Sequence, residues 1–299
     1  NGVPESLITG PASDWEKFQA FAATVPKCLR NPMYHWCALE LKRYFGIGTL
    51  LGPETARRIW DEANEKLPSL TARSLCAQSN VVTLCTTDDP ADGLDHHAAC
   101  AADRACPVAV FPAWRPDKGM QFDDPPALNA WIARLEAASG IEIGDSWSSY
   151  RDALQKRHDD FGAQGCRLSD HGNDTFYADE FTDEEIQEAF ARVRAGAVPT
   201  AAESAKLKSA FLHHGAVMDH AAGWTQQFHF GPLRNASTRI FRQVGPDAGC
   251  DSIGNPADAR SLARFLDRLD RDGRLAQTIL YNIHPGDNEM VASMIGNFQ

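Results

Sequence analysis

Residues Trp224 to Asn235 read Trp-Thr-Gln-Gln-Phe-His-Phe-Gly-Pro-Leu-Arg-Asn. The first half has the pattern of a short strand, in which His229 and the phenylalanines beside it face opposite sides. The strand is expected to end at Gly231-Pro232, because proline lacks the N–H group that a strand donates. Residues that end the strands of an alternating β/α chain face the active site. His229 and Arg234 there suit a metal ion or an anionic sugar acid; the alternative is a buried histidine and a surface arginine.

The same pattern, a short apolar run followed by polar residues, recurs along the chain. The predicted strands are residues 81–87, 108–114, 166–169, 224–230 and 278–283. The predicted helices are residues 13–23, 33–45, 52–67, 92–102, 126–139, 146–163 and 256–271, and residues 179–222 are predicted to contain helices that begin at Thr182 and Thr200. Ser13 and Glu16 have the spacing of a capping box at the start of the first helix. Helices between successive strands are the crossovers that a parallel sheet requires. The chain is therefore predicted to be α/β, either an open doubly wound sheet or part of a barrel, because five strands do not close an eight-stranded barrel.

Polar side chains follow each predicted strand. They are Asp88 and Asp89; Arg115, Asp117 and Lys118; Asp170 and His171; His229 and Arg234; and His284 and Asp287. In a parallel fold these strand ends converge on one face, so the five groups together predict a site. Carboxylates, imidazoles and guanidinium groups suit a small polar substrate, with or without a divalent metal. No dinucleotide-binding GxGxxG, phosphate loop, GxSxG elbow or HExxH motif supports another chemistry.

Composition excludes several classes of protein. The net charge of −11 argues against nucleic acid as the main partner, although one or two local arginines can still hold a small anion. No apolar run approaches the roughly 20 residues of a membrane helix. No signal peptide is visible in residues 1–25, although the chain begins at Asn1 rather than Met. The eight cysteines form no CxxC pair, which favours reduced thiols in a cytoplasmic protein.

Several longer motifs carry a resemblance to a known family. They are Asn31-Pro32-Met33-Tyr34-His35-Trp36, Thr86-Thr87-Asp88-Asp89-Pro90, Trp114-Arg115-Pro116-Asp117-Lys118, Ser169-Asp170-His171, Gln226 to Gly231 with Leu233-Arg234-Asn235, and Ile295-Gly296-Asn297-Phe298-Gln299. In these residues, and in their order, the chain resembles the uronate (glucuronate) isomerases of the amidohydrolase superfamily.

The resemblance implies a distorted (β/α)8 TIM barrel of the metallo-dependent hydrolase type with inserted helices. The five visible strands would be strands 2 to 6 of an incomplete barrel. Residues 1–80 would be a helical insertion between barrel strands 1 and 2, and residues 81–299 the partial barrel, with a helical insertion at 179–222. The family's His-x-His metal motif would precede Asn1, and a metal-binding aspartate and an arginine would follow Gln299.

The resemblance also implies roles for individual residues. His229 would ligate a divalent metal, expected to be zinc, with the remaining ligands outside this chain; the alternative is that His229 contacts the substrate. Arg115 would bind the substrate carboxylate, and Arg234 and Asp88 would contact the substrate. Asp170 and His171 are the catalytic candidates; for these two and for Asp88, structural hydrogen bonding is the alternative.

The implied reaction interconverts D-glucuronate with D-fructuronate, and D-galacturonate with D-tagaturonate, through a cis-enediolate in hexuronate catabolism. The alternatives are a metal-dependent hydrolase of the same superfamily and a non-catalytic sugar-acid binding protein. The expected partners are a small uronate and further copies of the same chain, without nucleic acid or membrane. Residues 1–299 expressed alone are expected to be inactive and poorly folded, because an open barrel leaves apolar strands uncovered. An isomerase assay checks this, and turnover by the isolated chain at the rate of the whole enzyme would contradict it.

Overall fold

The computed structural model describes residues 2–254 and 257–298. They form two compact units, which we call the helical unit (residues 2–82 with 106–108) and the sheet unit (residues 83–105, 109–254 and 257–298). Among the described residues, no helix is both long enough and apolar enough to cross a lipid bilayer.

Short helices make up the helical unit. They are η1 (Glu5–Leu7), α1 (Asp14–Thr24), η2 (Val25–Lys27), α2 (Pro32–Phe45), α3 (Ala56–Lys66), η3 (Leu67–Ser69) and α4 (Ala72–Gln78). The predicted capping box is present, since Ser13 and Glu16 satisfy each other's backbone N–H groups at the start of α1. Gly46 ends α2 in the left-handed conformation, with φ at 65°. A small core that includes Ala22 and Ile59, both fully buried, holds these helices together.

The sheet unit contains the strands and the longer helices. Its strands are β1 (Thr83–Cys85), β2 (Ala109–Phe111), β3 (Leu168–Asn173), β4 (Thr225–Phe230), β5 (Pro232–Leu233), β6 (Ser252–Ile253) and β7 (Thr278–Asn282). Its helices are α5 (Asp95–Ala102), η4 (Asp117–Met120), α6 (Pro125–Ser139), α7 (Trp147–Ala163), α8 (Asp183–Arg194), α9 (Ala201–Ala222), α10 (Thr238–Val244), α11 (Ala259–Arg271), η5 (Pro285–Asp287) and α12 (Asn288–Ile295).

Five strands lie side by side in the order in which they occur in the sequence. β1 pairs with β2, and β3 pairs with β4, which pairs with β7; all of these pairs are parallel. Parallel bridges from Trp114 to Asp88 and to Ser169 connect the two groups. A doubly wound sheet reverses its strand order at a switch point, whereas this order does not reverse. The observed α/β topology therefore confirms a parallel sheet crossed by helices, and its sequential order is the one that a barrel uses.

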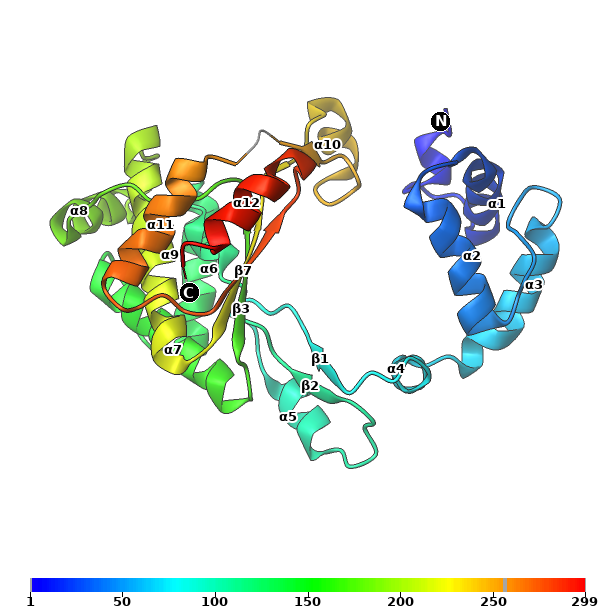
Figure 1. Cartoon of the computed structure of the whole chain (residues 1–299), viewed down its shortest axis with the longest axis horizontal. Coiled ribbons are helices and arrows are strands. Elements are labelled where there is room, and N and C mark those ends of the chain that lie inside the picture. Colours follow the sequence, from blue (N-terminus) through cyan, green and yellow to red (C-terminus); the bar gives the residue numbers. More distant parts are fainter. Residues whose placement is uncertain (1, 255–256, 299) are drawn as a thin grey trace. The chain divides into compact units, whose positions relative to one another are not determined.

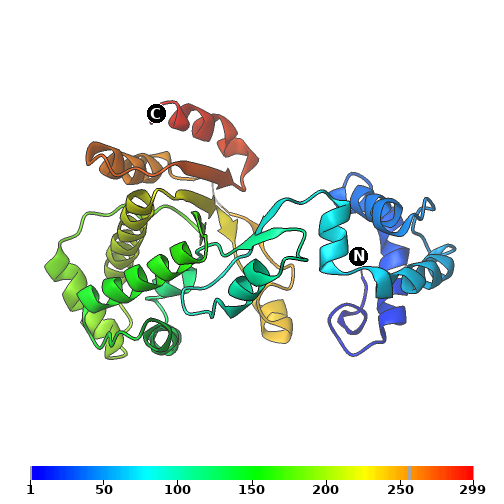
Figure 2. The same cartoon turned by 90° about the horizontal axis from the view of Figure 1, so that it is seen from below.

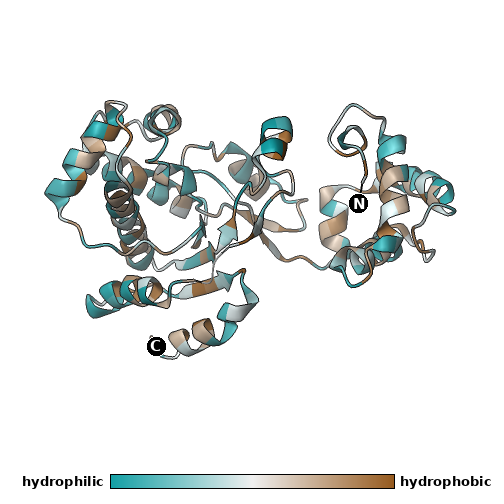
Figure 3. Cartoon of the chain, turned by 90° about the horizontal axis from the view of Figure 1, so that it is seen from above, coloured by the Kyte–Doolittle hydropathy of each residue, from teal (hydrophilic) through white to brown (hydrophobic). Residues whose placement is uncertain are grey.

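The two faces of the sheet differ in what covers them. Helices α6, α7, α8, α9 and α11 lie on one side of the β3–β4–β7 strands, and Figures 1 and 2 show this layer from two directions. On that side Phe228 and Phe230 are buried. The opposite face carries His229 and the half-exposed Ile279 and Tyr281. Hydrophobic residues of β7 can be followed in Figure 3. We call this second face, on which half of the His229 side chain is exposed, the open face.

The structure corrects several predicted boundaries. The third strand was predicted to end at Ser169 but continues to Asn173, because β4 pairs with it along its whole length. Asp170 and His171 therefore lie inside a strand rather than after it. β1 and β2 are shorter than predicted, and Val82 is exposed. Helices α4, α10 and α12 were not predicted. The predicted start of α11 at Pro256 lies outside the described residues, as do Asn1 and Gln299.

A buried polar network joins the helix layer to β3. Ser169 Oγ donates a hydrogen bond of 2.6 Å to Asp219 Oδ2, and His158 Nε2 lies 3.0 Å from Asp219 Oδ1. The His158 ring stacks on Trp224 with a centroid distance of 3.6 Å. Because these polar groups are fully buried and satisfied by one another, they fix α7 and α9 against the strand that carries Asp170.

The pKa of His214 predicts how the stability of the sheet unit depends on pH. Burial, the charge of Arg151 and the neighbouring His213 lower the pKa of His214 from 6.5 to about 4. Between these values the unfolded chain binds a proton that the folded chain does not, so this group lowers stability as the pH falls through that window. Replacing His214 with Gln should flatten this part of the pH–stability curve, by at most about 3 kcal/mol in urea unfolding.

The His220→Gln variant is the matched control, because His220 is exposed near the end of the same helix. Equal flattening in both variants, or none in His214→Gln, would contradict the assignment.

Candidate functional site

A cavity of about 340 Å³ opens on the sheet unit at the carboxyl ends of β4 and β7. Its lining residues are Arg115, His229, Phe230, Pro232, Arg234, Asp251, Tyr281, Asn282 and Ile283. Three of the predicted site residues, Arg115, His229 and Arg234, therefore share one cavity. It is large enough for a monosaccharide, and its lining contains cationic, imidazole and phenol groups that could orient a polar ligand.

Asp170 lies beside this cavity and connects two of its walls. Its carboxylate is buried, with Arg115 Nη1 3.3 Å from Oδ2 and His229 Nε2 3.0 Å from Oδ1. The imidazole is not aligned for a hydrogen bond, so Oδ1 has no hydrogen-bond partner among the described residues. A buried carboxylate oxygen without a donor is costly, which makes Oδ1 available to a proton, a cation or a ligand hydroxyl.

Asp117 holds Arg115 in place from the opposite side. Arg115 Nε donates a hydrogen bond of 2.9 Å to Asp117 Oδ2, and the backbone N–H of Gly172 donates to the same oxygen at 3.0 Å. Burial lowers the pKa of Arg115, but the hydrogen bond and charge of Asp117 and the charge of Asp170 outweigh it, so the pKa is raised and the guanidinium stays charged. A Cβ on Gly172 would lie 2.6 Å from Arg115 Nη2. The strand can therefore pass beneath the guanidinium only because this residue has no side chain.

A neighbouring tyrosine fixes the orientation of the His229 ring. The imidazole stacks on Tyr281, with a centroid distance of 4.5 Å and an interplanar angle of 6°. The register of β4 and β7 pairs these two residues directly. Tyr281 Oη in turn donates a hydrogen bond of 3.0 Å to Gln227. About half of the His229 side chain remains exposed, so its ring can still meet a ligand.

Arg234 and Asp251 form the outer wall of the cavity. Their ion pair is reinforced by the backbone N–H of Asn235, which donates a hydrogen bond of 2.9 Å to Asp251. That hydrogen bond and the Arg234 guanidinium lower the pKa of Asp251. The pairing of β5 with β6 brings the two segments together. Sequence reasoning missed Asp251 and Tyr281, because each reaches the cavity through strand pairing that leaves no local signal.

Two predicted site residues lie away from the cavity. His171 is buried on the helix-covered face, where it stacks on Phe228 at a centroid distance of 4.8 Å and where burial lowers its pKa. Asp88 accepts hydrogen bonds from Thr86 Oγ1 at 2.6 Å and from the backbone of Ala113 at 3.2 Å. These contacts match the structural alternative for Asp88, and strand alternation separates His171 from its neighbour Asp170.

Two donors of a metal site are present in this arrangement. His229 Nε2 and Asp170 Oδ1 are close enough to contact one divalent ion, and the missing hydrogen bond between them fits that use. Across the described ranges, however, no group of three or more His, Cys, Asp or Glu side chains could hold a metal. The fit to a metal is therefore partial, because two ligands do not make a stable site.

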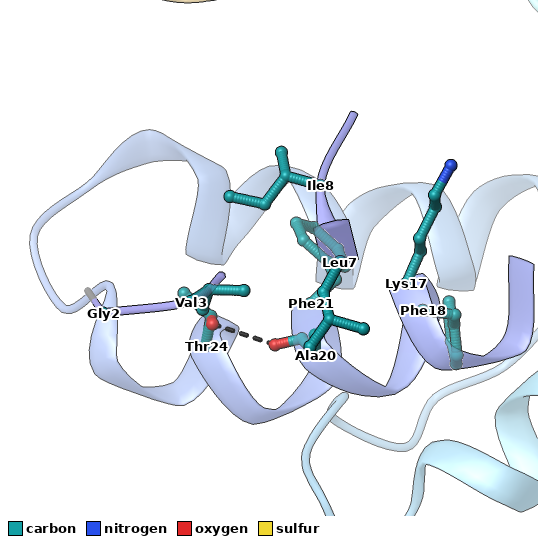
Figure 4. A pocket seen from close by; sticks show the side chains of 9 residues that line it. All are labelled: Gly2, Val3, Leu7, Ile8, Lys17, Phe18, Ala20, Phe21 and Thr24. Atoms are coloured by element: carbon teal, nitrogen blue, oxygen red, sulfur yellow. Dashed lines mark hydrogen bonds between the residues drawn. The ribbon is translucent and has the colours of Figure 1, made fainter. Parts of the chain in front are cut away.

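A second cavity, of about 530 Å³, lies in the helical unit (Figure 4). Its described lining is mainly apolar, from Leu7, Ile8 and Phe21, with Lys17 as the charged member. The hydroxyl of Thr24 is already used, since it donates a hydrogen bond of 2.9 Å to Ala20 O. No set of polar groups converges there, so the cavity of the sheet unit is the better candidate for a site that carries out chemistry.

Comparison with known proteins places the chain in a family. The sequence model of the glucuronate isomerases matches residues 1–299. The chain belongs to the glucuronate isomerase family. Curated relatives include the uronate isomerases of Cellvibrio japonicus, 50% identical over 302 residues, and Phocaeicola vulgatus, 48% identical over 302 residues. Each alignment covers 100% of this chain and 64% of the relative, so the chain spans about two-thirds of their length.

Solved structures of family members have the same fold. The uronate isomerase of Thermotoga maritima superposes with a TM-score of 0.93 and 30% identity, covering 99% of this chain and 65% of that one. The glucuronate isomerase of Caulobacter crescentus gives a TM-score of 0.86 and 28% identity, covering 96% and 60% of the two chains. The resemblance stated from the sequence motifs is thus confirmed at the level of family.

The space above Gly172 allows a direct test of the contacts that hold Arg115 between Asp117 and Asp170. A Gly172→Ala methyl group would meet Arg115 Nη2 at 2.6 Å and Asp117 Oδ2 at 3.0 Å. We expect the guanidinium to move away from Asp170 and the free energy of unfolding to fall by about 1–3 kcal/mol, the usual cost of overpacking. A crystal structure of the variant and chemical denaturation measure both effects.

Gly215→Ala in α9 is the control, since its added Cβ would meet nothing within 4 Å. If Arg115 did not move in Gly172→Ala, the guanidinium would be packed less closely against Gly172 than these contacts indicate.

Proposed function

We propose that this chain forms part of a uronate isomerase that interconverts D-glucuronate with D-fructuronate, and D-galacturonate with D-tagaturonate. The main support from the structure is the cavity in which Arg115, Arg234 and His229 meet beside the buried carboxylate of Asp170. Two guanidinium groups suit an anionic sugar acid, and a carboxylate beside an imidazole suits proton transfer. Membership of the family points to the same reaction.

Arg115 is proposed to bind the uronate carboxylate. Asp117 accepts a hydrogen bond from Nε and Asp170 accepts one from Nη1, so the other N–H groups of the guanidinium remain for a ligand. A charged guanidinium held at two points gives the substrate one orientation, which fixes the carbon that faces Asp170. Arg234, at the outer wall, would contact the substrate, either while its ion pair with Asp251 persists or after that ion pair has opened. Asp88 is proposed to act only indirectly, through the backbone that leads to Arg115.

Asp170 is proposed as the group that moves the proton. When the C2 proton of the aldose is removed, its electron pair forms the C1–C2 double bond of an enediolate, and the π pair of the C1–O1 bond moves onto O1. The proton of the O2 hydroxyl is transferred to O1, the C2–O2 double bond forms, and the C1–C2 π pair takes up a proton at C1. The product is the ketose, so no external oxidant is needed. Oδ1 of Asp170 lacks a hydrogen-bond donor and is therefore free to accept that proton. His171 is proposed to support this step from the other face of β3.

A divalent metal, zinc in our proposal, would be held by His229 with Asp170 beside it. When bound, such an ion would supply a positive charge that stabilises oxyanions on the substrate. Tyr281 would keep the His229 ring in place for this purpose. The relatives are longer than this chain, and we propose that further ligands belong to segments that align outside residues 1–299.

The sheet unit is proposed to be part of a distorted (β/α)8 barrel, with β1, β2, β3, β4 and β7 as barrel strands 2 to 6. Its strands follow one another without reversal, and its open face carries Ile279 and Tyr281, which the interior of a closed barrel would bury. Residues 1–80 and 179–222 are proposed as the helical insertions. Cytoplasmic location and assembly into a homo-oligomer stay predictions.

The proposed role of Arg115 can be tested in the full-length protein. Arg115→Lys keeps the charge but loses the two-point geometry, so we expect the KM for D-glucuronate to rise by about 10- to 100-fold, with a smaller change in kcat. The conversion of D-glucuronate to D-fructuronate can be followed by NMR. Arg134→Lys is the matched control, because Arg134 makes an exposed ion pair with Asp92.

An unchanged KM in Arg115→Lys would refute the carboxylate assignment. Absence of any isomerisation by the wild-type full-length protein, together with saturable binding of uronate, would instead favour a sugar-acid binding protein.

A further inference from the structure

A third cavity, of about 230 Å³, lies within the helix layer of the sheet unit. Four arginine and histidine side chains line it: Arg151 of α7, His213 and His214 of α9, and Arg274 after α11. Helix α9 packs against both α7 and α11, so three segments far apart in the sequence meet here. The cavity shares no lining residue with the one that contains Arg115 and His229.

The two arginines of this cavity have no anionic partner. Among residues 2–254 and 257–298, neither the Arg151 nor the Arg274 guanidinium has a hydrogen-bond or ion-pair partner. By contrast, Arg268 of α11 has an anionic partner, because its Nη2 lies 2.7 Å from Glu180 Oε1. Asp183 is the carboxylate that lines the cavity, and it makes no ion pair with either arginine. The local balance is therefore positive, in a chain whose net charge is −11.

A buried imidazole nitrogen of this cavity also lacks a partner. His214 Nε2 is buried and has no hydrogen-bond partner among the described residues. Burial and the charge of Arg151 lower the pKa of His214, and burial and the charge of Arg268 lower that of His213. Asp272 and Glu180 act on His213 in the opposite direction, more weakly. Burial is the larger cause of the lowered pKa values, and the positive charge of the neighbouring arginines adds to it.

We propose that this cavity is a binding site for a small tetrahedral oxyanion, either inorganic phosphate or the phosphate group of a monoester. A phosphate offers acceptor oxygens in several directions, which matches donors that come from three separate elements. A carboxylate is planar and is satisfied by the fork of one arginine. The bound anion would neutralise Arg151 and Arg274, accept a hydrogen bond from His214, and cross-link α7, α9 and the segment after α11.

The site would connect anion binding with stability and protonation. Because the anion binds the folded state, it raises the free energy of unfolding by an amount that grows with the logarithm of the anion concentration above the Kd. It also raises the pKa of His214 from its value of about 4, since a negative charge beside the ring favours the imidazolium. This inference does not depend on the proposed isomerase reaction, because the two cavities have no residues in common.

The test is calorimetric titration of the full-length protein with inorganic phosphate, in a phosphate-free buffer of low ionic strength. We expect saturable binding to one site per chain and an upward shift of the His214 pKa in NMR titrations. Arg151→Gln and Arg274→Gln should each weaken binding by about ten-fold or more. Arg274 is exposed, so its replacement is compatible with folding, and unfolding without phosphate checks this.

Arg242→Gln is the matched control, because Arg242 is an exposed arginine of α10 that lies outside the cavity. No saturable binding at millimolar phosphate would overturn the proposal, and so would equal weakening by Arg242→Gln. Acetate that binds the same site as tightly as phosphate would overturn the preference for a tetrahedral anion. A titration with phenyl phosphate distinguishes the two ligands. A site for phosphate monoesters binds it, whereas a site that admits only inorganic phosphate does not.

Discussion

The parallel register between β3 and β4 is the constraint on which the candidate site depends. It places Gly172 opposite His229 and Asp170 opposite Gln227. In a pleated sheet a shift of one residue would send every side chain of a strand to the other face. Asp170 would then enter the apolar core, and His171 would replace it at the cavity. The hydrogen bond from buried Ser169 to Asp219 and the stacking of His171 on Phe228 exclude that shift, because β3 would lose both contacts.

The register also determines how charge is distributed around Arg115. Two carboxylates, Asp117 and Asp170, approach one guanidinium from different sides, and Gly172 leaves the space that this requires. The arrangement keeps the Arg115 guanidinium charged in a partly buried position and leaves some of its N–H groups without a partner. His229 shares Asp170 with Arg115, so an incoming anion or cation would change the interactions of all three residues. A site that binds a carboxylate and also transfers a proton requires groups that are coupled in this way.

Local signals predicted much of the secondary structure. Capping boxes at Thr182 and Thr200, like the one at Ser13, begin their helices where the sequence indicates. They work because the side chain and the N–H groups it satisfies lie within one turn. The short helices α4 and α10 carry no long hydrophobic period and were missed. The end of β3 was placed too early because Asp170, His171 and Gly172 read as a polar turn, whereas pairing with β4 holds them extended.

By itself, the sequence determined the order of strands and helices, the family, and three of the residues that meet at the cavity. These features depend on short segments whose residue types act through neighbours in the chain. Only the tertiary structure decided that Asp170 faces Arg115 and His229 while His171 is buried, and that Tyr281 and Asp251 complete the cavity. The physical reason is that these contacts join segments dozens of residues apart, and strand register and helix packing, rather than local sequence, determine which side chains meet.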